Sequence, residues 1–181
     1  MLDTVSAPAP GDPFVIAQPA RPYAQEVNAP VPPLRIAWTA DSWQPGTTVD
    51  PEVVGCVEQA VSVCEAAGHE LVEASPVFDY ETYLHAVCVA WAFGMYAGMD
   101  MFAAMTGRPI SEDTLEPVML SYYEYSRGLT GADMFMAEFV LNSFRRTFGK
   151  FLERYDMLLT PTLIQLPERL GRYTKMRTDI G

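Results

Sequence analysis

The chain has little basic charge. Its 181 residues include 12 Lys and Arg against 23 Asp and Glu, for a formal net charge of -11 at pH 7. It has no basic run or Lys/Arg-rich face, which argues against nucleic acid or an anionic membrane as a partner. Only 19% of the residues are charged and 49% are hydrophobic, so the composition is that of a folded chain with a packed core. The length fits one domain, or one domain and part of another.

Cysteine and histidine are also scarce. The three cysteines, Cys56, Cys64 and Cys88, have no C-x-x-C spacing, which argues against a disulfide framework and a zinc site. We expect them to be buried thiols in a reducing, cytoplasmic compartment. No cationic segment followed by an apolar one is found at the N-terminus, so no secretory signal is predicted. No metal-ligand spacing is present, and neither a metal nor a cofactor is predicted.

No hydrophobic run is long. The most apolar stretch, residues 86–99, ends at Asp100 and falls short of the roughly 18–20 residues that a transmembrane helix needs. Gly94 and Gly98 lie in it at the spacing that lets helices approach closely. We therefore predict a buried helix with a close helix contact at these glycines, and no membrane partner.

The two ends of the chain are predicted to be irregular. Residues 1–33 are a connector, and the many prolines between positions 6 and 33 break helices and strand interiors. The apolar residues 14–16 are expected to anchor this connector to a surface. Residues 167–181 show no clear period and predict an irregular tail.

The region between them, residues 34–166, predicts an α/β domain. Strand-like runs at 34–38 and 69–75 flank a helix that begins after Asp50 and ends at Gly68. A strand, a helix and a strand of these lengths form a βαβ unit, whose two strands are parallel neighbours.

The second half of this region is predicted to be mainly helical. Helices are expected over 79–105 and 117–127, and from Thr130 to 154, where Thr130 and Asp133 have the spacing of a capping box. The apolar residues of the first of these helices occupy most faces, which predicts that it is buried.

A third strand, residues 156–160, ends abruptly at Thr160-Pro161-Thr162. Proline cannot donate a ladder hydrogen bond, so the chain should turn away from the sheet there. Hydroxyls just past a strand end often face a ligand site in α/β proteins. The alternative is that the two threonines only cap the strand.

No catalytic centre is predicted on this chain. A nucleophile needs an activating base and oxyanion donors, but there is no G-x-S-x-G turn and no glycine-rich loop. A Ser–Lys pair would have to use Lys150 or Lys175, the only lysines. His69 follows the glycine that ends a helix, where a cation is favoured. His85 and Cys88 lie three residues apart on one helix, which favours a core thiol beside a partly exposed imidazole.

Several short motifs in order resemble a known family. "LRIAW" is followed by "DPEV", by "GHE" after the predicted helix, and by "YDMLLTPTL". In this order and spacing, residues 2–166 resemble the C-terminal portion of the amidase signature family of amide hydrolases. The apolar segment before "TGRPI" is similar to the branch that acts on linear and cyclic amides such as aminohexanoate oligomers.

The resemblance implies a partial amidase-signature fold of the α/β class, with a few mostly parallel strands and several long buried helices. Family members hydrolyse amide bonds with a Ser–cis-Ser–Lys triad in a Gly/Ser-rich run, and no position here matches a triad member. The resemblance thus implies a hydrolase fragment that is inactive alone. Its expected partners are a small amide substrate in the parent enzyme and the missing N-terminal half. The alternative is a non-catalytic remnant or interaction module that has kept the amidase helices.

Four residues are candidates for the wall of a substrate pocket. Cys88 and Trp91 come from the apolar helix, and Thr160 and Thr162 from the strand end. A tryptophan in such a helix is also a common core residue. No catalytic residue is assigned.

Overall fold

The computed structural model describes residues 1–171, which excludes Lys175 and the end of the predicted tail. The chain divides into two compact units, Met1–Leu34 and a second that begins at Arg35. Each unit is built from its own local contacts.

The first unit contains two helical turns, α1 (Leu2–Val5) and α2 (Tyr23–Glu26). The Asp3 carboxylate accepts hydrogen bonds from the N–H groups of Tyr23, at 2.5 Å, and of the following residue, at 3.0 Å. A short helical turn, α2, thus forms within the stretch where the prolines were predicted to break helices. Pro22 is the N-cap of α2, where its missing N–H costs little. The side chains of residues 14–16 are exposed, and their anchoring role stays a prediction.

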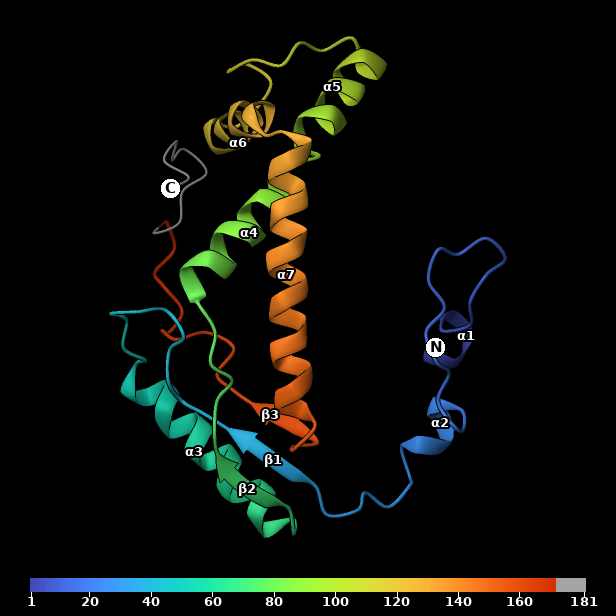
Figure 1. Cartoon of the computed structure of the whole chain (residues 1–181), viewed down its shortest axis with the longest axis vertical. Coiled ribbons are helices and arrows are strands. Elements are labelled where there is room, and N and C mark those ends of the chain that lie inside the picture. Colours follow the sequence, from blue (N-terminus) through green and yellow to red (C-terminus); the bar gives the residue numbers. More distant parts are fainter. Residues whose placement is uncertain (172–181) are drawn as a thin grey trace. The chain divides into compact units, whose positions relative to one another are not determined.

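The second unit begins with a three-stranded parallel sheet (Figure 1). The strand order is β2-β1-β3, with β1 at Arg35–Trp38, β2 at Glu70–Glu73 and β3 at Met157–Leu159. β1 pairs in parallel with both neighbours, which confirms the predicted βαβ unit. Ile36 and Ala37 on this central strand are buried.

The crossover helix α3 (Pro51–Ala66) has the predicted start and stop signals. Asp50 accepts a hydrogen bond from the Glu52 N–H at 2.9 Å. Gly68 has a φ of 90°, and its N–H donates to the Glu65 carbonyl at 2.9 Å. The next N–H, of His69, donates to the Cys64 carbonyl at 3.1 Å, which completes a Schellman ending.

Four further helices complete the unit: α4 (Tyr80–Ala92), α5 (Met95–Thr106), α6 (Pro117–Gly128) and α7 (Gly131–Leu152). α4 packs along α7, while α5 and α6 lie beyond the start of α7, away from the sheet (Figure 1). The helix predicted over 79–105 is thus divided by a turn at residues 93–94. The Tyr123 hydroxyl donates to Asp100 at 2.6 Å and ties α6 to α5, and this hydrogen bond raises the pKa of Tyr123.

The predicted capping box begins α7. The Thr130 hydroxyl accepts from the Asp133 N–H at 3.3 Å, and the Asp133 carboxylate accepts from the Thr130 N–H at 2.7 Å. These bonds need only residues three apart, which is why the sequence predicts them.

The expectation that α4 and α5 are buried is wrong for the part of the chain that the structure describes. Trp91 on α4 is 81% exposed and Phe102 on α5 is 62% exposed. α4 is covered on one face, by α7, where Ala86 and Val89 are buried. Leu84 and Trp91, on its other side, are exposed among the described residues.

The buried-thiol prediction is also wrong. Cys56 and Cys88 are exposed and Cys64 is half-buried. Successive helix residues point about 100° apart, so Cys56 lies off the buried stripe of Val57 and Val61. Cys88 likewise lies off the face of α4 that packs on α7.

One stretch within residues 1–171 has the length and composition of a membrane helix. It is Tyr80–Thr106, 27 residues whose most apolar window has a mean hydropathy of 1.4 and is 17% buried. The length argument drawn from the sequence therefore fails. The stretch is divided by the turn at residues 93–94, and it packs against α6 and α7. Core helices pass the same test of length and composition.

Gly94 and Gly98 do not mark a close helix contact within the described chain. A Cβ atom built on either would meet no heavy atom within 4 Å. Gly98 lies inside α5, where it costs about 1 kcal/mol against alanine. Gly107, which ends α5, has a φ of 68° and needs the left-handed conformation.

We predict that Gly98→Ala stabilises the chain by up to about 1 kcal/mol, because the helix gains propensity without a clash. Gly107→Ala is the matched control and should destabilise by about 1–2 kcal/mol, because it places a Cβ at positive φ. Denaturant midpoints of both variants and the parent chain measure this. A lowered midpoint for Gly98→Ala would show that the face is packed.

Candidate functional site

The carboxyl ends of the three parallel strands meet at one edge of the sheet. Thr39 follows β1, Ser75 lies two residues past β2, and Thr160 follows β3 directly. Ligand sites of open α/β sheets form at this edge. We therefore take the strand ends and the loops beyond them as the candidate site.

Two of these hydroxyls already have structural partners. Thr39 is buried, its N–H donates to the Leu159 carbonyl at 3.1 Å, and its hydroxyl accepts from the Asp41 N–H at 3.1 Å. The Ser75 hydroxyl accepts from Nε1 of Trp43 at 2.8 Å. Both groups hold the loop after β1 against the sheet.

The Thr160 hydroxyl differs from these two. It is half-buried and makes no hydrogen bond with any residue in 1–171. The strand-capping alternative thus finds no support in this part of the chain. Thr162, two residues on, is exposed.

An open hollow of about 580 Å³ lies at this edge of the sheet. Its lining includes Trp38, Asp41 and Thr48, and its other carboxylates come from Glu58 on α3 and Glu73 at the end of β2. None of the described residues that line it is a lysine or an arginine. Within residues 1–171, no group of three His, Cys, Asp or Glu residues has the arrangement to hold a metal ion.

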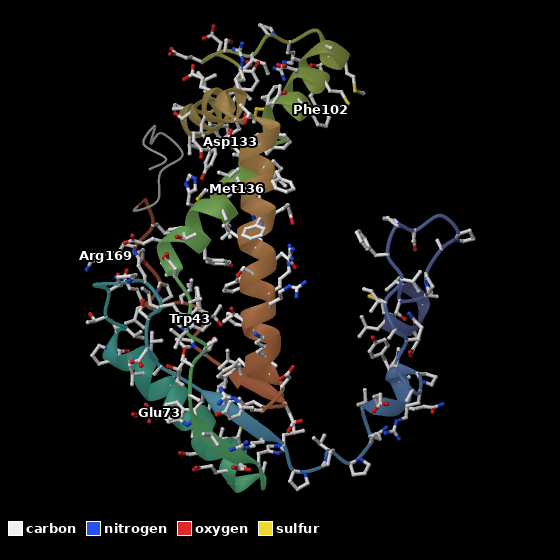
Figure 2. The ribbon with its side chains drawn as sticks, viewed as in Figure 1. Trp43, Glu73, Phe102, Asp133, Met136 and Arg169 are labelled. Atoms are coloured by element: carbon white, nitrogen blue, oxygen red, sulfur yellow. The ribbon has the colours of Figure 1, made fainter. Side chains whose placement is uncertain are left out.

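An aromatic cluster joins this edge to the helices. Trp43 meets Phe78 edge-on at 5.6 Å between ring centroids and Phe148 at 6.0 Å. Phe144 lies 4.9 Å from Phe78 and stacks on Tyr83 at 4.2 Å. In Figure 2, Trp43 lies beside the part of α7 that is nearest the sheet. The cluster fixes α4 and α7 relative to the strand ends.

The sequence did not single out Trp43, which lies in the loop after β1. Its position in a loop that follows the carboxyl end of a predicted parallel strand could have marked it as a residue near the site. Its partners, Phe78 and Phe148, come from segments far apart in the chain.

The helix candidates lie on one exposed face of α4. Leu84, Cys88 and Trp91 follow one another at four and three residues, so they form one stripe. Ala86 and Val89 lie on the opposite side and pack towards α7. The structure thus brings Cys88 and Trp91 together on α4. It places Thr160 and Thr162 on a separate segment, after β3.

The fold is α/β: a three-stranded parallel sheet with the crossover helix α3 packed on β2, and with the α4–α7 pair linked to the loop after β1 by the aromatic cluster. The chain matches the Amidase family over residues 1–180 and belongs to that family.

Its relatives are longer proteins. It is 27% identical over 176 residues to a putative amidase of Synechocystis sp., covering 97% of this chain and 32% of the relative. It is 28% identical over 165 residues to an acylamidase of Rhodococcus erythropolis, a match that covers 90% of this chain and 33% of the relative. The 6-aminohexanoate-cyclic-dimer hydrolase of Pseudomonas sp. is 23% identical, and the match covers 94% of this chain and 35% of that hydrolase. The chain thus spans about a third of the length of these relatives.

Solved structures have the same fold. A 6-aminohexanoate cyclic dimer hydrolase in complex with its substrate matches with a TM-score of 0.87 at 23% identity, over 99% of this chain and 38% of that chain. A bacterial aryl acylamidase matches with a TM-score of 0.68 at 15% identity, over 86% and 32%. These likenesses confirm a partial amidase-signature fold.

Two carboxylates on the helix pair have pKa values below the ordinary value of 3.8. The hydrogen bond from the Thr82 hydroxyl lowers the pKa of Asp79 most, and the Thr82 N–H adds to it. The Thr130 hydroxyl does the same for Asp133, helped by the Thr130 N–H. A lowered pKa stabilises the fold above the unfolded pKa, and this contribution is lost as the pH falls through the folded value.

We predict that Asp79→Asn with Asp133→Asn lowers stability at pH 7 and that the difference from the parent chain shrinks below about pH 4. The amide oxygen of asparagine can still accept a hydrogen bond at both positions, so the variant mainly removes the charge. Urea unfolding at several pH values measures the effect, with Asp113→Asn in an exposed turn as the control. A difference that is constant from pH 7 to pH 2 would contradict it.

Proposed function

We propose that this chain is one part of an amide hydrolase whose nucleophile, base and oxyanion donors lie on the rest of the amidase fold. The observation that carries this proposal is the Amidase match over residues 1–180 in a chain that spans about a third of its relatives. The chain alone is then inactive and supplies helices and strand ends around the substrate.

The side chains of the described region support this division. Amide hydrolysis needs an activated nucleophile and donors for the developing oxyanion. Lys150 is exposed and makes no hydrogen bond to a serine within residues 1–171. The buried Ser126 hydroxyl donates to the Tyr123 carbonyl at 2.8 Å, and the Ser75 hydroxyl is bound by Trp43. These serines serve the fold.

The proposed substrate is a small amide. The relatives include an acylamidase and a cyclic-dimer hydrolase, and both names describe cleavage of an amide. This chain contributes apolar and uncharged polar groups to such a pocket: the Cys88 thiol and Trp91 ring on α4, and after β3 the Thr160 hydroxyl, which has no hydrogen bond within residues 1–171.

We predict that the purified chain does not hydrolyse simple amides or aminohexanoate oligomers. Co-expression with an N-terminal half that carries a Gly/Ser-rich amidase signature should give activity, because joining the two pieces buries exposed apolar surface at about 25 cal/mol per Å². Release of amine or carboxylate measures both results. If the chain alone hydrolysed an amide and a serine-directed phosphonate abolished that hydrolysis, the result would contradict the proposal that the nucleophile lies outside this chain.

In the active complex, we predict that Trp91→Ala and Thr160→Val lower activity more than they lower the midpoint of unfolding. Trp91 is exposed in this chain, and Thr160→Val keeps the shape while removing a hydroxyl without a partner among residues 1–171. Val77→Ala, at an exposed position before α4, is the control. Equal losses in activity and stability would assign these residues to the core. Failure of several N-terminal halves to restore activity would favour a non-catalytic remnant.

A further inference from the structure

Helix α7 has two apolar faces. One packs on α4, where Ala137 is buried against Ala86 and Val89. Phe135 and Phe139 lie two residues before and after Ala137, so they project from the opposite side of the helix. They are 70% and 64% exposed.

The side of α7 that carries Phe135 and Phe139, its outer face, also carries positively charged side chains further along the helix. Arg146 follows Phe139 by seven residues and Lys150 follows by eleven, so both lie on the same side of α7 as the two phenylalanines. Both cations are exposed and have no ion pair within residues 1–171. Arg145, on the flank, is paired with Glu138 at 3.4 Å. A surface that fits this face has an apolar patch bordered by carboxylates.

We infer that the outer face of α7, defined by Phe135, Phe139 and Arg146, is the surface on which the remainder of the amidase fold docks. This rests on the proposed function. A solved amidase matches 99% of this chain but only 38% of its own, so most of such a chain must pack around this region. A helix that is apolar on opposite sides belongs in a middle layer, with cover on both.

The stripe on α4 has a different role. Leu84, Cys88 and Trp91 lie on the side of α4 that faces away from α7. The two exposed faces therefore project in opposite directions from the helix pair. α7 binds the remainder of the fold, while α4 faces the substrate.

The test is co-purification of this full chain with a tagged part of the Synechocystis putative amidase that leaves out the 32% of that protein matched by this chain. We expect Phe135→Ser with Phe139→Ser to lower the recovered chain at least about tenfold, since buried aromatic anchors dominate interfaces. Arg146→Glu should lower it separately. Phe102→Ser on α5 is the matched control, because Phe102 is 62% exposed, and should leave recovery unchanged. Far-UV circular dichroism confirms that each variant keeps its helices.

Equal recovery of the parent chain and the double variant would overturn the inference, as would no recovery of the parent chain. A dimer of the parent chain that the double variant converts to a monomer would assign the face to a second copy. Binding to phosphatidylcholine vesicles that the double variant abolishes would assign it to a membrane. Either result also overturns the inference. Recovery that depends on Phe135 and Phe139 but gives no amide hydrolysis would support this interface and reject the proposed function.

Discussion

The contact between α4 and α7 joins the two ends of the second unit. Ala86 and Ala137 are small, so the two helices approach closely and bury Val89 between them. At one end of α7, the rings of Phe144 and Phe148 pack on Phe78 beside the sheet. At the other end, α4 also meets α6 and α5 (Figure 1). Without this helix pair, the strands and the α5–α6 pair would have no common support.

The helices of this chain have more apolar surface than their described neighbours cover. α4 has the Leu84–Cys88–Trp91 stripe outside its contact with α7, and α7 has Phe135 and Phe139 outside the same contact. Large exposed apolar patches usually mark a surface that binds something. The chain spans about a third of the length of its relatives, and helices with two apolar faces fit the middle layer of a larger fold.

The hydroxyl groups that follow the three strands differ in their hydrogen bonds. The hydroxyls of Thr39 and Ser75 accept hydrogen bonds from the loop that carries Trp43 and hold it in place. Thr160, after the third strand, makes no hydrogen bond within the described part of the chain. A polar group at the carboxyl edge of a parallel sheet without an internal partner is available to a ligand. This difference is the structural basis for placing Thr160 at the proposed substrate site.

The sequence determined the features that depend on residues close together in the chain. Asp50 and Gly68 bound α3, and Thr130 with Asp133 begins α7, because each signal acts through hydrogen bonds across two to five residues. The parallel βαβ unit followed from element lengths. Only the tertiary structure decided the turn at residues 93–94, the exposure of Cys88 and Trp91, and the partners of Trp43. Burial and ring contacts depend on which distant segments meet, and local hydrophobicity shows that a face is apolar without showing what covers it.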